Sequence, residues 1–149
     1  MATQKATDIN SRITMADGAY GNDSVHYGKV ALTSPGTSDV LRLVRIPAGF
    51  RVDELTIIND DVESSSTAMT VRIGYTPCNS DDGPVADEDY FFPTGSTTLT
   101  AKSRTTSLAK PKVFEYDVFI DIFLEAAPGA FIAGSEVHCI VRGENIGTD

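Results

Sequence analysis

The stretch Ala68-Met69-Thr70-Val71-Arg72-Ile73-Gly74-Tyr75 alternates apolar and polar side chains along its length. Its larger apolar members occupy every second position and are Met69, Val71, Ile73 and Tyr75. Successive side chains of a β-strand point to opposite faces of the sheet, so this period is that of a strand with one face in a core. The stretch therefore predicts a β-strand.

Further strands are predicted on both sides of this one. Residues 25–33, 40–46, 50–59 and 135–142 have strand-like apolar spacing, and turns such as Ser34-Pro35-Gly36 and Pro47-Ala48-Gly49 separate them. Proline and glycine favour turns because they supply the backbone angles that a reversal needs. Within residues 40–46, Leu41 and Leu43 share a face, which Arg45 joins if the alternation continues.

The longest alternation covers residues 113–124 and predicts one continuous strand. Its core face would hold Phe114, Tyr116, Val118, Ile120, Ile122 and Leu124, and its polar face Glu115, Asp117, Phe119, Asp121 and Phe123. The segment 78–106 has no such spacing, apart from short apolar islands at Tyr90-Phe91-Phe92 and Leu99. It is predicted to be irregular and acidic.

These patterns predict an all-β protein. No segment has the roughly 3.6-residue apolar spacing of a helix. Seven or eight short strands between turns are typical of an antiparallel β-sandwich or jelly roll of about eight strands, covering residues 25–149 as one domain. Residues 1–24 contain few large apolar side chains. They are predicted to form an extended N-terminal arm, either loose or ordered by a neighbouring molecule.

Composition narrows the range of partners. The net charge is −9, from 21 acidic and 12 basic residues, and the basic residues form no run. Nucleic-acid binding depends on clustered Lys and Arg, so no nucleic-acid partner is expected. No apolar run approaches the roughly 20 residues that cross a bilayer, and the N-terminus lacks the apolar stretch of a secretory signal, so no membrane partner is expected and the protein is expected to be made and kept inside a cell.

The two cysteines, Cys78 and Cys139, have no metal-binding or redox spacing. Cys139 lies between Val137 and Val141 in an alternating segment and is predicted to pack in the core. Two free thiols suit a cytosolic product, and a disulfide between them stays an alternative that spacing cannot decide.

No catalytic residues, metal ligands or cofactor are predicted. The chain has two isolated histidines, His26 and His138, and lacks a Gly-x-Ser-x-Gly motif. Asp117 and Asp121 suggest a glycosidase pair, but no Trp is present to line a sugar cleft. The acidic segment 81–89 suggests calcium binding, yet its spacing is not that of an EF-hand, and charge runs of this kind are usually solvated. Binding or assembly is therefore favoured over catalysis.

Aromatic residues supply the candidate interface. Phe119 and Phe123 interrupt the polar face of the 113–124 strand, so either the arm or a loop covers them or they contact another protein. Tyr20 and Tyr27 complete the candidate interface set. Exposed tyrosines, including Tyr90, also suit carbohydrate stacking.

Several segments resemble the cement, or decoration, proteins of tailed-bacteriophage capsids. The resemblance spans residues 25–142 and rests on Ile46-Pro47-Ala48-Gly49-Phe50-Arg51-Val52, on Asn59-Asp60-Asp61, on residues 65–75, on Tyr90-Phe91 after an acidic segment, and on residues 117–122 before a final strand. It implies a jelly roll on the capsid exterior, assembled in the host cytoplasm, whose homodimers or homotrimers bridge major capsid proteins.

Under this resemblance, residues 1–24 would serve as an attachment strap that orders on binding. Two alternatives to a cement protein stay open. One is a glycan-binding head-fibre or adhesin module, and the other is a head–tail joining protein or minor tail component.

Overall fold

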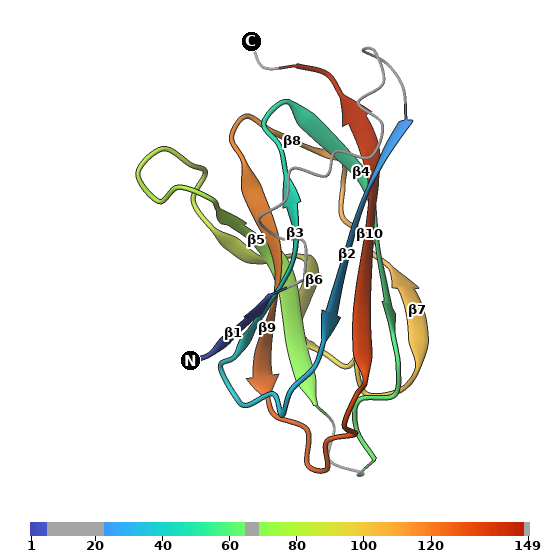
Figure 1. The fold of residues 1–149 in the computed structure, drawn as a ribbon. Coiled ribbons are helices and arrows are strands. Elements are labelled where there is room, and N and C mark those ends of the chain that lie inside the picture. Colours follow the sequence, from blue (N-terminus) through green and yellow to red (C-terminus); the bar gives the residue numbers. More distant parts are fainter. Residues whose placement is uncertain (6–22, 65–68, 148–149) are drawn as a thin grey trace.

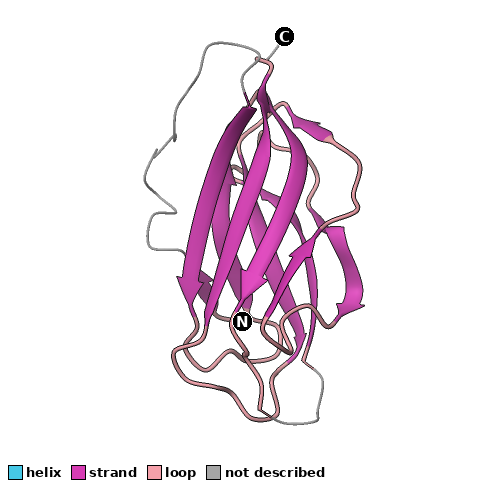
Figure 2. Cartoon of the chain, turned by 90° about the vertical axis from the view of Figure 1, so that its right-hand side faces the viewer, coloured by secondary structure: helices cyan, strands magenta, loops and turns pink. Residues whose placement is uncertain are grey.

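The computed structural model describes residues 1–5, 23–64 and 69–147. Within these ranges the chain forms strands and loops without a helix, as Figures 1 and 2 show. The strands are β1 (Thr3–Lys5), β2 (Asp23–Ala31), β3 (Val40–Ile46), β4 (Phe50–Asn59), β5 (Thr70–Pro77), β6 (Asp87–Ser96), β7 (Ser103–Thr106), β8 (Lys112–Phe114), β9 (Val118–Ala126) and β10 (Glu136–Asn145).

The strands form two sheets that pack face to face (Figure 1). Sheet A has the order β1-β3-β9-β5-β6, and sheet B has the order β2-β10-β4-β7, with β8 also paired to β4. All pairings are antiparallel except that of β1 with β3. The predicted β-sandwich is confirmed, and the arrangement is consistent with a jelly roll. β1, β6 and β7 lie outside the predicted strand segments, and β8 and β9 divide one predicted strand.

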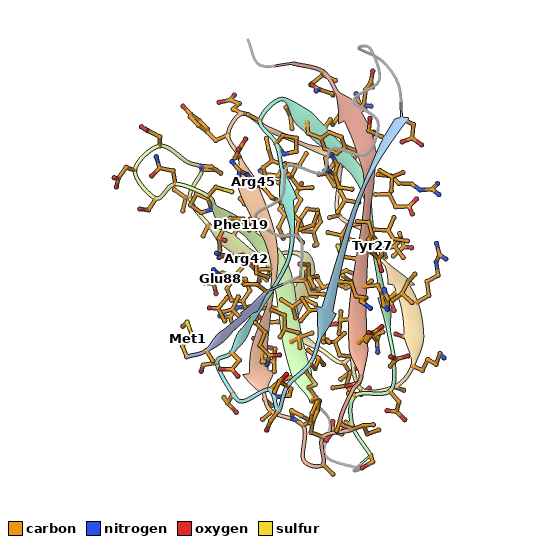
Figure 3. The ribbon with its side chains drawn as sticks, viewed as in Figure 1. Met1, Tyr27, Arg42, Arg45, Glu88 and Phe119 are labelled. Carbon is orange, nitrogen blue, oxygen red and sulfur yellow. The ribbon has the colours of Figure 1, made fainter. Side chains whose placement is uncertain are left out.

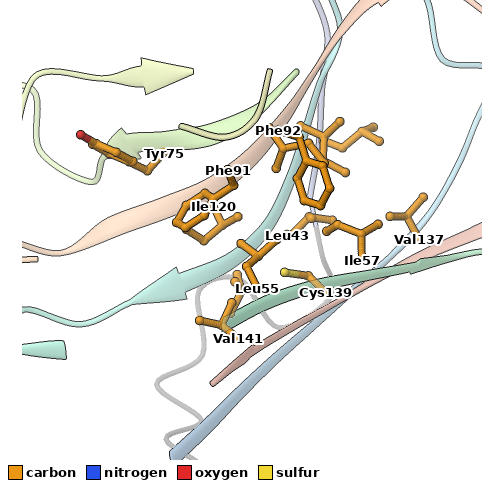
Figure 4. Close-up of a cluster of buried hydrophobic side chains, with 14 of the residues drawn as sticks. Leu43, Leu55, Ile57, Tyr75, Phe91, Phe92, Ile120, Val137, Cys139 and Val141 are labelled. Atoms are coloured by element: carbon orange, nitrogen blue, oxygen red, sulfur yellow. The ribbon is translucent and has the colours of Figure 1, made fainter. Parts of the chain in front are cut away.

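The core lies between the sheets (Figure 4) and is almost entirely apolar. Leu43, Ile57 and Ile120 contribute from β3, β4 and β9, and each is at most 1% exposed. Cys139 is fully buried on β10, as predicted from the alternation around it. Because burial of apolar surface contributes about 25 cal/mol per Å², this layer is the main source of stability.

One glycine allows the sandwich to close along its β2–β3 side. A Cβ atom on Gly28 would lie 2.0 Å from the carbonyl oxygen of Leu43. Only a residue without a side chain lets β2 approach the backbone of β3 this closely.

The predicted continuous strand 113–124 is wrong, because it is two strands in different sheets. β8 belongs to sheet B and β9 to sheet A, with a bend at Glu115 and Tyr116 between them. Tyr116 is consequently 48% exposed instead of lying in the core row. The other five apolar residues of that row are buried as predicted. The opposite face is drier than predicted, since Asp121 is fully buried and Phe123 is 8% exposed.

The irregular segment predicted at 78–106 is also wrong in part, because it contains β6 and β7. The pairing of β5 with β6 has two register shifts, and Pro93 and Gly95 lie within β6. These bulges break the alternation that would reveal a strand. Phe91 and Phe92 nevertheless reach the core.

A bulge also decides the place of Arg45. The register of β3 against β9 shifts between Arg42 and Val44, which reverses the faces after Leu43. Leu41 and Leu43 are buried as predicted, whereas Val44 and Ile46 replace Arg45 in the core.

Part of the predicted arm is a strand of sheet A. β1 pairs in parallel with Val40–Arg42 of β3. The Gln4 side chain exchanges two hydrogen bonds with the backbone of Thr33, at 3.1 and 2.9 Å. Residues 6–22, including the candidate Tyr20, lie outside the described residues.

Candidate interface surfaces

The outer face of sheet A is organised around a buried ion pair. Asp121, in the middle of β9, accepts hydrogen bonds from Nε and Nη2 of Arg42, both at 3.0 Å. The Thr76 hydroxyl donates a third bond to it at 2.6 Å. The Asp121 side chain is fully buried, whereas that of Arg42 is 23% exposed. Buried charge is tolerated only when paired in this way, so the cluster fixes the position of Arg42 on this face.

The candidate Phe119 stacks against the same arginine. The Arg42 guanidinium lies 4.1 Å from the centroid of the Phe119 ring, within the range of a cation–π contact. Phe119 is half-buried, and Figure 3 shows it beside Arg42 and Arg45. The second phenylalanine of the prediction, Phe123, lies 5.3 Å from the guanidinium of Arg72 and is buried within the chain.

A groove of about 510 Å³ lies on this face next to Phe123. Arg72 spans it, donating to Glu88 at 3.0 Å and to Glu125 at 3.1 Å. Met1 and Thr3 form part of its wall. The hydrogen bond to Glu88 is the main reason that the pKa of Arg72 is raised. These ion pairs hold the long side chains in place, so a partner that binds here loses little side-chain entropy.

Asp117 stabilises the end of the same sheet. Its carboxylate accepts hydrogen bonds from the Arg45 guanidinium and, at 2.8 Å, from the backbone N–H of Ala48 in the β3–β4 turn. The bond to Asp117 raises the pKa of Arg45. Asp117 and Asp121, which the sequence suggested as a glycosidase pair, are therefore each paired with an arginine in a structural ion pair.

Tyr27 lies on the outer face of sheet B and is 50% exposed. Its hydroxyl is 2.6 Å from Nδ1 of His138 on β10. Lys29 donates to Glu136 at 2.8 Å on the same face. The structure thus brings Phe119 and Phe123 to one face, places Tyr27 on the opposite sheet, and leaves Tyr20 outside the described residues.

Sequence reasoning missed the arginine partners of this face. The register places Arg42 opposite Asp121 and Arg45 opposite Phe119 on neighbouring strands. Arg42 and Asp121 are both charged residues within apolar strands. The two residues pair because β3 lies next to β9 in the sheet. Strand order is a tertiary property, and it cannot be read from two residues about 80 positions apart in the sequence.

The described residues bear on the metal and disulfide hypotheses. Among the residues described, no group of three or more His, Cys, Asp or Glu side chains is arranged to hold a metal ion. Cys78 and Cys139 are both free thiols. Burial raises the pKa of the Cys78 thiol to about 11 and raises that of Cys139 as well. No helix in the described part of the chain is long and apolar enough to cross a membrane.

Solved structures contain chains with the same fold as this one, whereas the other comparisons find no match. No protein-family model and no curated protein matches the chain. Among solved structures, similar folds occur in chains of bacteriophage capsids. A chain from the capsid of Ralstonia phage GP4 is 18% identical with a TM-score of 0.78, and the match covers 99% of this chain and 100% of that one.

Two further phage structures contain similar chains. One from the cyanophage Pam1 capsid asymmetric unit is 21% identical with a TM-score of 0.67, over 87% of this chain and 89% of that one. One from the acidic stable capsid of Helicobacter pylori bacteriophage KHP30 is 15% identical with a TM-score of 0.60, over 87% and 92%. At these identities the likeness establishes a shared fold.

Proposed function

We propose that this chain is a non-enzymatic structural protein of a tailed-phage virion that binds the outside of the capsid and bridges major capsid proteins. The observation that carries the proposal is the whole-length structural match to a chain of the Ralstonia phage GP4 capsid. The match covers 99% of this chain and 100% of that one, so the two chains share one architecture along almost their whole length.

The construction of the sandwich supports this role. A bridging protein must transmit force between its contacts without deforming. Here the outer face of sheet A is locked by the Arg42–Asp121 and Arg72–Glu88 ion pairs. A subunit that spans several shell proteins adds contacts that must break together, which stabilises a thin shell against internal pressure.

The outer face of sheet A is the surface that we assign to the shell. It combines a half-buried aromatic ring at Phe119, charged side chains held in place, and a groove. Aromatic residues and arginines with fixed geometry are enriched in protein interfaces. The negative net charge suits a partner surface that is less acidic.

Co-sedimentation with empty, expanded shells of the encoding phage tests this assignment. We expect saturable binding that Phe119→Ser weakens, because the substitution removes the ring from the contact. Tyr116→Ser is the matched control, since it removes a different aromatic ring, which is exposed at the bend between β8 and β9.

Circular dichroism of both variants checks that folding is retained. Binding by Phe119→Ser equal to that of the unaltered protein would contradict the assignment of this face. Loss with Tyr27→Ser instead would move the contact to sheet B. Binding of the protein at only one vertex of each shell would favour the alternative of a head–tail joining protein.

A further inference from the structure

Acidic and basic side chains are separated along residues 73–114 of the sequence. Residues 73–101 contain no Lys or Arg, and they hold Asp81, Asp82, Asp87, Glu88 and Asp89. Residues 90–114 contain no Asp or Glu, and they hold Lys102, Arg104, Lys110 and Lys112. We call residues 78–89 the acidic loop and residues 102–112 the basic edge.

The acidic loop projects from the sandwich as a shaped protrusion. It comprises the connection from β5 to β6 and the first three residues of β6, and the connection extends to the left in Figure 1. A Cβ atom on Gly83 would lie 2.3 Å from the Pro77 side chain and 2.7 Å from the carbonyl oxygen of Asn79, so the backbone folds tightly back on itself. Val85, near its end, is 89% exposed.

The basic edge borders sheet B. It consists of β7, the connection to β8, and the start of β8, all along the edge of β4. Figure 1 shows β7 on the right, on the opposite side of the sandwich from the acidic loop. Leu108 lies in the connection and is 99% exposed. The connection is fixed, because the Tyr90 hydroxyl donates to the carbonyl oxygen of Lys110 at 3.0 Å and Ser107 donates to that of Phe91 at 2.7 Å.

Apart from Glu88, the charged side chains of these two surfaces have no ion-pair partner in the described part of the chain. Salt bridges there engage Lys29, Arg42, Arg45, Arg51 and Arg72. None engages Lys102, Arg104 or Lys110 on the basic edge, or Asp81, Asp82, Asp87 or Asp89 on the acidic loop. Glu88 is paired within the chain, with Arg72.

We propose that the acidic loop of one copy docks on the basic edge of a second copy of this chain. The two surfaces have opposite unpaired charge, and each presents one strongly exposed aliphatic side chain, Val85 and Leu108. Complementary charge steers association and sets the register, while the aliphatic side chains supply apolar area. The proposal goes beyond shell binding, because it concerns contacts between copies.

The contact joins different surfaces of the two copies. A two-fold dimer accommodates it when the acidic loop of each copy meets the basic edge of the other, so that the contact is made twice. Placing acidic loop on acidic loop would set like charges against each other. Repeated head-to-tail contacts close into a ring when the rotation between copies permits it. A closed oligomer, either a two-fold dimer or a ring, is therefore expected.

Molar mass by light scattering tests the proposal on the full chain without shells. We expect a multiple of the 15.9 kDa chain mass. Raising the ionic strength from about 0.1 M to about 1 M shortens the screening length from about 10 to about 3 Å and should shift the mass towards that of the monomer. Reversing one surface, by Asp81→Lys with Asp82→Lys or by Lys102→Glu with Arg104→Glu, should also give the monomer.

Combining all four substitutions restores opposite charge and should restore the oligomer. All four positions are exposed, so folding should be retained. Asp61→Lys with Arg142→Glu changes exposed charges elsewhere and is the matched control. A monomeric unaltered protein, an oligomer that survives either reversal, or failure of the combined variant to reassociate would overturn the proposal. Because shells are absent, none of these outcomes bears on shell binding.

Discussion

Asp121 is a fully buried carboxylate whose charge is balanced on the outer face of sheet A by Arg42. Thr76 supplies its remaining hydrogen bond. Breaking such a pair leaves one charge uncompensated, whereas replacing both partners with apolar residues of similar size is often neutral. The same pair also positions Arg42 over Phe119, so a residue buried for stability shapes the surface assigned to the shell.

Asp121→Ala is therefore expected to lower the free energy of unfolding by about 3–5 kcal/mol. The double substitution Arg42→Met with Asp121→Leu should recover much of this loss while removing the cation–π contact with Phe119. Urea denaturation followed by circular dichroism measures both. A loss below about 1 kcal/mol for Asp121→Ala would show that the pair contributes no more than a typical exposed one.

At the scale of elements, β1 is held to sheet A by polar contacts at its start. The Ala2 N–H donates to the Asp39 carboxylate at 2.8 Å, and Val40 N–H donates to the carbonyl oxygen of Ala2 at 3.0 Å. Hydrogen bonds from the backbone N–H groups of Gly36 and Ala2 lower the pKa of Asp39 from its ordinary value of 3.8.

This direction fixes the pH dependence of β1. A carboxyl group with a lowered folded-state pKa stabilises the folded arrangement above its unfolded pKa, and the stabilisation is lost as pH falls through the folded pKa. We expect the NMR signals of Thr3–Lys5 and Val40 to shift below pH 3.8, while those of β10 in the other sheet do not. Asp39→Asn should remove the transition. A transition unchanged in that variant would assign it to another group.

The elements that the sequence predicts well are those with uninterrupted alternation. β3, β4, β5 and β10 begin and end within a few residues of their predicted bounds, because one face of each lies in the core. β6 and β7 were not predicted, because bulges and Pro93 interrupt the alternation of β6 and because β7 is short. The break at Tyr116 was not predicted, because the apolar alternation continues across it while the chain passes from one sheet to the other.

The candidate interface was also predicted only in part. Phe119 and Phe123 share a face, as their spacing requires, but the burial of Phe123 depends on neighbouring strands that are distant in the sequence. The sequence lists the arginines of this face, but it does not identify their carboxylate partners, because these depend on which strands are neighbours in the sheet. Local periodicity therefore predicts which side chains share a face, and only tertiary structure tells which of them are exposed.

At the scale of the whole molecule, three surfaces have separate proposed roles. The outer face of sheet A is assigned to the shell, whereas the acidic loop and the basic edge are assigned to neighbouring copies. A closed oligomer of copies, each holding a shell protein, would multiply the contacts that must break together. Contacts between copies would then reinforce the shell beyond what single attachments provide.

The most direct test of the central claim is the thermal stability of the capsid shell itself. Empty expanded shells prepared without this protein should melt at a lower temperature than the same shells after saturation with it, as followed by scanning calorimetry. Adding the Phe119→Ser variant at equal concentration should restore less of the difference than the Tyr116→Ser control. Equal melting temperatures for bare and saturated shells would contradict a stabilising role, even if the protein were found bound.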